Sequence, residues 1–177
     1  MRWAALLKGV NVGGNRKLPM AALKTLIESL GYRQVKTVLA SGNVVFECDE
    51  RDGAVIEARL KEALKTLGLD TDVVLRNGGD IDRIVGADPF PDAARDRPSH
   101  YIVVFHRDPV PDGLIGRIPD FYQGPERLAA IGLELYIDYA DGIGESKLPQ
   151  AMAKVKFPKL ATARNWNTVL KLRDMLA

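Results

Sequence analysis

The first 76 residues alternate strand and helix patterns in an order that few folds accommodate. Apolar and β-branched runs predict strands at 3–10 and 71–76, with a hairpin at 35–49 between them. Helical periodicity covers the two remaining segments, 19–32 and 53–68. The resulting order, β-α-β-β-α-β, is that of the split unit of a ferredoxin-like plait. We therefore predict an α+β fold, a two-layer sandwich with a mainly antiparallel sheet.

The two helices of this predicted unit have start and stop signals and one apolar face each. Pro19 occupies the first position of the earlier helix, and Gly31 follows its end. Gly68 ends the later helix. The residues expected on the buried faces are Met20, Leu23, Ile27 and Leu30 in the first helix, and Val55, Ile56, Leu60, Leu64 and Leu67 in the second.

The second half of the chain has a similar mixture of strands and helices, without an exact sequence repeat. Asn-Gly-Gly-Asp at 77–80 interrupts the chain, so we predict two subdomains, 1–78 and 79–177. The elements predicted beyond it are a short helix from 81 to before Pro89, a Pro- and charge-rich loop at 89–98, a strand at 99–106, a weak helix at 110–118, a hairpin at 127–139, and helices at 146–157 and 165–176. No long flexible linker occurs, which favours two packed plait subdomains.

Five segments carry a resemblance to a known family: ALLKGVNVGGNRKLPMAAL, TVLASGNVVFE, DPFP, YADGIGESKL and TARNWNTVLKL. In this order, over nearly the whole chain, they resemble the bacterial domain-of-unknown-function 1697 family. The resemblance implies paired α/β plaits and a cytosolic protein, and it implies no established reaction. The chain departs from the family pattern at Lys8, where arginine is common, and at Asp88, where asparagine often precedes the Pro-Phe step.

Charge is distributed unevenly along the 177 residues, although the formal net charge is only +2. Residues 1–36 have a net charge of +6 and residues 145–177 of +5, so the segment between them carries −9. Basic ends that meet in space would form a positive surface, which favours an anionic ligand or nucleic acid as partner. The alternative is that these lysines and arginines only face water.

The sequence has few features of an exported or membrane protein. No apolar run approaches the roughly 20 residues that cross a bilayer. Lys8 interrupts the apolar start MRWAALLKGV, and no small-residue cleavage site follows it. The single cysteine, Cys48, excludes an internal disulfide framework and is typical of a reducing compartment. We expect a cytoplasmic location and no membrane partner.

The segment GVNVGGNRK, residues 9–17, raises the question of a nucleotide site. A phosphate-binding P-loop requires G-x-x-x-x-G-K-[ST], but Asn15 and Arg16 follow Gly14 where the lysine and the hydroxyl belong. The dinucleotide pattern G-x-G-x-x-G is absent as well. Three glycines, two asparagines, two cations and a helix that begins at Pro19 still favour a general anion or polar-ligand site. A long structural turn is the alternative.

Topology adds a second loop to this candidate site. In a plait, the loop after the first strand and the hairpin turn at 41–43 lie at the same end of the sheet, on strands about 5 Å apart. The last helix begins with RNWN, where Asn165 or Thr162 can act as the cap, and Ser146 can cap the helix before it. These helix starts can also complete the site. The candidate ligand-binding residues are Lys8, Asn11, Gly13, Gly14, Asn15, Lys17, Ser41 and Asn43, with Lys147, Arg164 and Asn165 from the C-terminal side.

Residues for other chemistries are sparse. His100 and His106 lie roughly 20 Å apart at 3.3 Å per strand residue, too far to share a metal ion. Cys48 stands beside Asp49 and Glu50, which should raise the pKa of its thiol and make it inert. We expect no metal and no cofactor, and we assign no catalytic residue.

Three functions are compatible with these patterns. Binding of a small anionic or polar ligand at the two loops is the preferred hypothesis. A nucleic-acid-binding accessory protein could use the basic ends, but base stacking is disfavoured because the first and third strands offer only Trp3 and Phe46. An enzyme at the same cleft would need a titratable group there beyond lysine and arginine. The sequence gives no indication of the oligomeric state.

Overall fold

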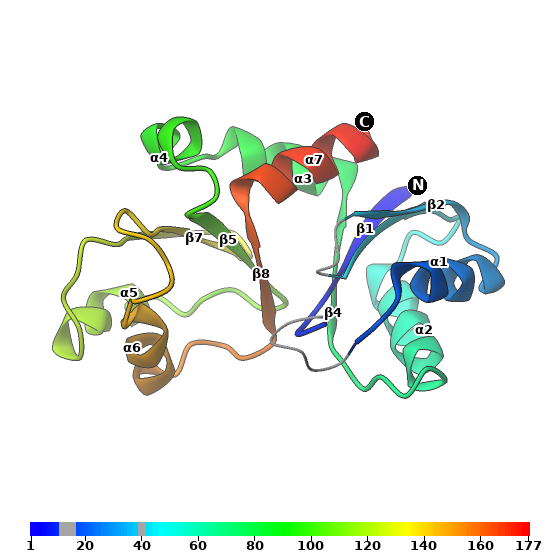
Figure 1. Cartoon of the computed structure of the whole chain (residues 1–177), viewed down its shortest axis with the longest axis horizontal. Coiled ribbons are helices and arrows are strands. Elements are labelled where there is room, and N and C mark those ends of the chain that lie inside the picture. The colour runs from blue at the N-terminus through cyan, green and yellow to red at the C-terminus, as the bar shows by residue number, and fades with distance from the viewer. Residues whose placement is uncertain (11–16, 39–41) are drawn as a thin grey trace. The chain divides into compact units, whose positions relative to one another are not determined.

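The computed structural model describes residues 1–10, 17–38 and 42–177. Its contacts divide the chain into two units, one made of Met1–Arg83 with Lys171–Ala177, the other of Ile84–Leu170. Each unit contains one four-stranded antiparallel sheet with helices packed on it (Figure 1). The predicted α+β class with two plait-like subdomains is therefore confirmed, whereas the exact boundary at residue 78 stays a prediction.

The first unit follows the predicted order of elements. They are β1 (Arg2–Leu7), α1 (Met20–Ser29), β2 (Arg33–Val38), β3 (Asn43–Glu47), α2 (Gly53–Lys65), β4 (Val73–Asn77) and the beginning of α3 (Gly78–Gly86). The strand order is β2-β3-β1-β4 and all pairings are antiparallel. β1 is an inner strand of this sheet, and its residues from Trp3 to Leu7 are all buried. Next to its start, the Arg2 guanidinium donates to the backbone oxygen of Ala177.

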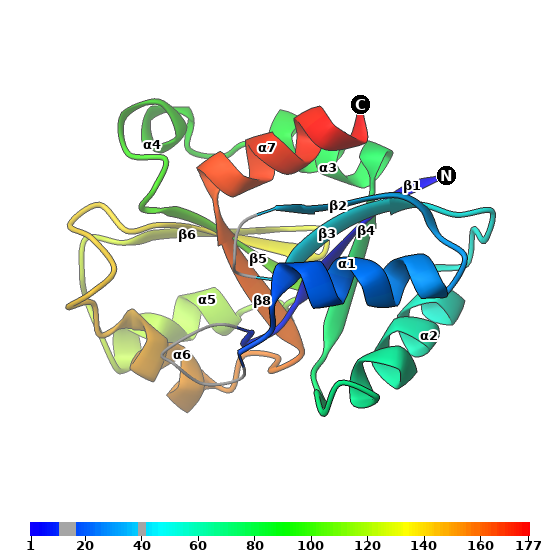
Figure 2. The ribbon, with the colours of Figure 1, turned by 45° about the vertical axis from the view of Figure 1, so that its right-hand side comes forward.

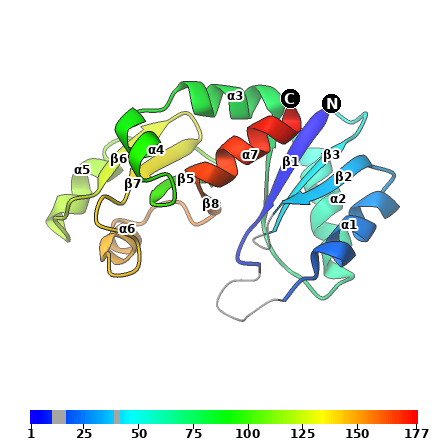
Figure 3. The same cartoon turned by 45° about the horizontal axis from the view of Figure 1, so that its top comes forward.

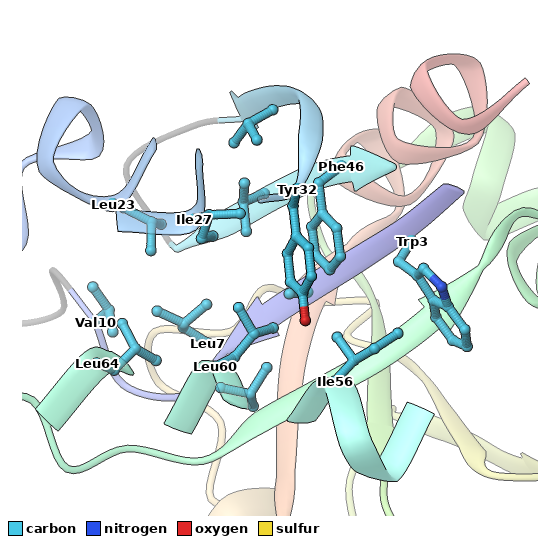
Figure 4. Close-up of a cluster of buried hydrophobic side chains, with 14 of the residues drawn as sticks. Trp3, Leu7, Val10, Leu23, Ile27, Tyr32, Phe46, Ile56, Leu60 and Leu64 are labelled. Atoms are coloured by element: carbon cyan, nitrogen blue, oxygen red, sulfur yellow. The ribbon is translucent and has the colours of Figure 1, made fainter. Parts of the chain in front are cut away.

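The core of the first unit lies between its sheet and the helices α1 and α2, which cover the same face of the sheet (Figure 3). Leu23 and Ile27 reach into this core from α1, and Leu60 enters it from α2 (Figure 4). The rings of Tyr32 and Phe46 stack with their centroids 4.8 Å apart and their planes within 8°. Burial of these apolar side chains is the main stabilising contribution to the unit.

Two residues predicted to be buried on α2 are instead exposed. Val55 is 39% and Leu67 is 41% exposed. Val55 lies about 100° from Ile56 around the helix axis, so only one of the two can face the core. Leu67 lies beyond the end of α2 at Lys65. Ala63 contributes to the buried face of the helix in their place.

The second unit repeats the sheet arrangement of the first. Its elements are α4 (Pro91–Asp96), β5 (Tyr101–His106), α5 (Leu114–Arg117), the 3₁₀ helix η1 (Ile118–Asp120), β6 (Arg127–Ile131), β7 (Glu134–Asp138), α6 (Leu148–Val155), β8 (Ala161–Asn165) and the beginning of α7 (Trp166–Leu176). The strand order is β6-β7-β5-β8, again antiparallel throughout. We count the strands of each unit along the sequence. In both sheets the third strand then lies on one side of the first strand, and the fourth strand lies on its other side.

The sequence-based prediction was wrong at two elements of this unit. No strand was predicted at β8, because ATARN contains a single β-branched residue. The predicted loop at 89–98 contains the short helix α4, in which Pro91 occupies a first-turn position and Asp92 adds an acidic side chain to that turn. Pro91 therefore begins a helix, although its segment was predicted to be a loop.

Helices α5 and α6 lie on one side of the second sheet (Figure 2), and η1 packs into the same core through Ile118. Their apolar residues form a core with β7, which includes Ile118, Leu135, Ile137, Tyr139, Leu148, Ala151 and Val155. A charged cluster lies at the last residue of β7, where the fully buried carboxylate of Asp138 pairs with Arg97 and Arg127. Asp92 accepts from both of these arginines as well.

Candidate functional site

Gly42, the residue just before β3, packs against the end of β1 and Val10 in the first unit. The Leu7 N–H donates a 2.9 Å hydrogen bond to the Gly42 carbonyl. Gly42 has a φ of 79°, and a Cβ there would lie 3.0 Å from the Cβ of Leu7 and 3.3 Å from that of Val10. The end of β1 therefore contacts the residue just before β3, as the plait topology predicts. Only glycine combines this backbone conformation with this close approach.

Three of the predicted site residues in the first unit can be located. Lys8 is half-buried. Its backbone N–H donates to the Asp72 carbonyl at 3.0 Å, and its backbone carbonyl accepts from the Thr71 hydroxyl. Lys17 is exposed. Asn43 is fully buried, and its Nδ2 donates to the Val38 carbonyl at 2.9 Å, so this amide closes the hairpin. The predicted residues Asn11, Gly13, Gly14, Asn15 and Ser41 lie outside the described residues.

The predicted start of the last helix is a strand-to-helix junction. Arg164 and Asn165 end β8, and the Asn165 Oδ1 accepts from the N–H and the hydroxyl of Thr168, each at 3.0 Å. Asn165 therefore caps α7, which confirms one of the two predicted caps. Thr162, the other candidate cap, instead accepts a 2.7 Å hydrogen bond from Arg164.

Arg164 does not present its guanidinium at an exposed helix start. It is 8% exposed, and its Nη1 also donates to the Ala163 carbonyl at 2.7 Å. Burial lowers the pKa of this guanidinium to about 10, because the charged form loses hydration. Lys147 is exposed immediately before α6, and Ser146 accepts from the first helical N–H, that of Leu148, at 3.2 Å. A contribution of Lys147, Arg164 and Asn165 to a site with the first unit stays a prediction.

Both units have the same junction, which the sequence-based reasoning missed. In the first unit Arg76 and Asn77 end β4, and the Asn77 Oδ1 accepts from the Asp80 N–H at 2.9 Å. Arg76 is also buried, and it pairs across the sheet with Ala4 just as Arg164 pairs with Val103. The signal in the sequence is the dipeptide Arg-Asn, which occurs at 76–77 and 164–165 directly before a helix.

The structure contains a pocket in the second unit that the sequence did not indicate. It has a volume of about 320 Å³ and lies where α5, η1, the start of β6 and the start of α6 come together. Its walls are mostly apolar, and the polar exceptions include the carboxylate of Glu126 and the hydroxyl of Tyr122. The residues lining it are Ile115, Ile118, Pro119, Tyr122, Gln123, Gly124, Glu126, Leu128 and Leu148.

Groups for other chemistries are buried or dispersed. Cys48 is a buried free thiol whose pKa is raised, chiefly by burial and to a lesser extent by Glu50 and Asp49. Within the described residues, no group of three His, Cys, Asp or Glu side chains is arranged to hold a metal ion. The rings of Trp3 and Phe46 belong to the core, so they are not available to stack on nucleic-acid bases.

The fold and these contacts define a two-unit α/β plait protein with a duplicated strand-to-helix junction. The chain belongs to the DUF1697 family, described as a protein of unknown function, whose model matches residues 1–136. Three of the five segments that carry the resemblance lie in this range, and the segments that begin at Tyr139 and Thr162 follow it.

One solved structure shows the same fold over the full chain. The conserved bacterial protein SP0830 from Streptococcus pneumoniae is similar with a TM-score of 0.72 and 22% sequence identity, covering 99% of this chain and 98% of that one. At this identity the likeness supports the fold alone. No curated protein matches the sequence. Among the described segments, none of the helices has the length and apolar character of a transmembrane span.

Proposed function

We propose that this protein binds a small anionic ligand at the end of the first unit's sheet, where β1 runs into the glycine-rich segment. The contact of Gly42 with Leu7 and Val10 supports the proposal, because the turn before β3 and the beginning of the 9–17 segment meet there. Glycine-rich segments at the start of a helix offer backbone N–H groups to anions.

The charge of this region favours an anion over a cation. Residues 1–36 carry a net charge of +6. Lys8 and Lys17 flank the 11–16 segment. Buried residues close to each lysine in the sequence, Val10 and Leu18, fix the position of the backbone there. The loop residues that belong to the proposed site on sequence grounds are Asn11, Gly13, Gly14, Asn15 and Ser41. The proposal concerns the first unit alone.

A thermal-shift experiment tests this function with inorganic phosphate, a sugar phosphate, a nucleoside triphosphate and citrate as probes. A ligand that binds the native state raises the Tm by mass action. We expect at least one of these anions to raise the Tm, and Lys17→Met to abolish the rise. Lys24→Met removes an exposed lysine of α1 and is the matched control. Equal shifts in both variants, or no shift with any probe, would contradict the proposal.

Nucleic acid is the competing partner, because phosphate contacts could also use the basic ends of the sequence. Such binding would weaken steeply with added salt. Retention on RNA or DNA at low salt, together with no response to the small anions, would favour it. An enzyme at this site would need a titratable group beyond lysine and arginine, and we propose none. We also propose a cytoplasmic location, for which the unpaired thiol of Cys48 is the support.

A further inference from the structure

The pocket of the second unit contains a carboxylate held only by neutral groups. The Tyr122 hydroxyl lies 3.0 Å from both oxygens of Glu126, and the Ser146 hydroxyl donates to Oε1. Among the described residues, no lysine, arginine or histidine forms an ion pair with Glu126. A carboxylate beside apolar walls, without a cationic partner, gains most from a ligand that brings a positive charge.

The tyrosine hydroxyl that holds this carboxylate stays a neutral donor. Burial, followed by the hydrogen bond to Glu126, raises the pKa of Tyr122 above its ordinary value. The Tyr122 hydroxyl therefore adds no negative charge to that of the Glu126 carboxylate. The hydroxyl orients that charge without neutralising it.

Gly124 keeps one side of the carboxylate free of side-chain atoms. A Cβ at this position would overlap with Tyr122 Oη and Glu126 Oε2. Among the residues that the structure describes, Tyr122 alone donates to Oε2, whereas Oε1 accepts from both hydroxyls. Since a carboxylate oxygen has two lone pairs, Oε2 can accept a further hydrogen bond from a ligand.

The surrounding charge is negative as well. Residues 117–147 contain six acidic residues and three basic ones, Arg117, Arg127 and Lys147. The Arg127 guanidinium is engaged with Asp138 and Asp92, at 2.7 Å from each. The segment that supplies Tyr122, Glu126 and Ser146 therefore favours cations by its net charge.

From these contacts we infer that the pocket binds a small organic ammonium ion. The ammonium group donates to Glu126 Oε2, and the apolar body of the ligand packs against Ile115, Ile118 and Leu128. A volume of about 320 Å³ is at the lower end of the range for small-molecule sites, so the ligand is an amine with one ring or a short alkyl chain. This site is separate from the proposed anion site and opposite to it in charge preference.

Calorimetric titration of the full chain with three probes of similar body tests the inference. Phenylethylammonium is the cation, phenylethanol the neutral analogue and phenylpropionate the anion. We expect the ammonium ion to bind about tenfold or more tightly than the alcohol, since hydrogen bonds to charged groups are the stronger ones, and the anion to bind most weakly. Equal affinity for cation and alcohol, tighter binding of the anion, or no binding of the cation would overturn the inference.

Glu126→Gln keeps the shape of the side chain and removes its charge. It should reduce ammonium affinity to that for the alcohol, while Asp120→Asn, which removes an exposed acid of η1, should change it less than about twofold. Retention of full ammonium affinity in the glutamine variant would overturn the assignment. If that variant does not fold, amide chemical shifts of the wild-type protein decide. Perturbation of Gly124 and Glu126 by phenylethylammonium supports the site, and perturbation only elsewhere refutes it.

Discussion

Replacing Asp138 with asparagine should destabilise the second unit by about 3 kcal/mol. The buried carboxylate accepts from Arg97 Nε and Nη2 at 2.7 and 2.5 Å, and from Arg127 Nε and Nη2 at 2.9 and 2.7 Å. Oδ2 accepts three of these four hydrogen bonds. Asparagine replaces one carboxylate oxygen with an NH2 group. In either orientation of the amide, this NH2 group faces an arginine N–H, so two donors meet and no hydrogen bond forms there.

The magnitude depends on how far the two arginines can recover. Removing one partner of a buried ion pair costs about 3–5 kcal/mol, because the remaining charge is left without compensation. The side chains of Arg97 and Arg127 are 27% and 42% exposed, and both also contact Asp92. In the variant, both guanidinium groups can regain some hydration and still pair with the Asp92 carboxylate. The expected loss of unfolding free energy therefore lies at the lower end of that range.

The two tryptophans allow the second unit to be followed by itself. Trp3 lies in the first unit and Trp166 in the second, where it stacks on Tyr101 with ring centroids 4.9 Å apart. In a Trp3→Phe background, urea unfolding monitored by the remaining fluorescence reports on the Trp166 environment. Asp96→Asn is the matched control, because its ion pair is exposed and its loss should cost less than about 0.5 kcal/mol.

The same variant should lose its effect in acid. The hydrogen bond from Arg97 above all, and that from Arg127, lower the pKa of Asp138 below its ordinary value, against the opposing effect of burial. A lowered native pKa stabilises the protein above the unfolded value of about 3.9, and this contribution is lost as pH falls through the native pKa. The difference between wild type and Asp138→Asn should therefore shrink below about pH 4. A loss no larger than that of Asp96→Asn, or one that persists unchanged in acid, would refute the reasoning.

Three further predictions use simple readouts. Gly42→Ala should cost about 2–3 kcal/mol in urea unfolding, because it adds a clash with β1 to an unfavourable φ, whereas Gly31→Ala, with a φ of 82° and nothing within 4 Å, should cost about 1 kcal/mol. Equal losses would show that the close contact is unimportant. Cys48 should react with a thiol reagent about tenfold or more slowly in the native than in the unfolded protein, since it is buried and its pKa is raised; similar rates would contradict its burial. Asn165→Ala should cost about 1 kcal/mol through loss of the cap, compared with less than about 0.5 kcal/mol for the exposed Asn167→Ala, and thermal unfolding separates the two.

Local patterns predicted the first unit well because its signals agree with one another. The periodicity of Leu23 and Ile27, the β-branched runs around Gly42 and the stop at Gly31 all favour one order of elements. The same patterns missed β8, where Ala163 and Asn165 have low strand propensity and the pairing with β5 determines the structure.

The pocket could not be predicted in this way. Glu126 and Ser146 are 20 residues apart, and their hydrogen bond exists only because β6 and α6 begin close together. Nothing in the spacing of Tyr122 and Glu126 indicates that a hydroxyl orients a carboxylate. No sequence pattern distinguishes Gly124, whereas the structure shows that its lack of a side chain is needed beside both groups.

The assignment of Lys171–Ala177 to the first unit has a consequence for synthesis on the ribosome. The backbone oxygen of Leu176 would lie 3.4 Å from a Cβ at Gly78, and the Arg2 guanidinium donates to Ala177, so both ends of the first unit's sequence contact these late residues. Residues 84–170 are translated before them. The nascent first unit can form its sheet and core early, but it receives its last helical segment, the end of α7, only after the entire second unit has been made.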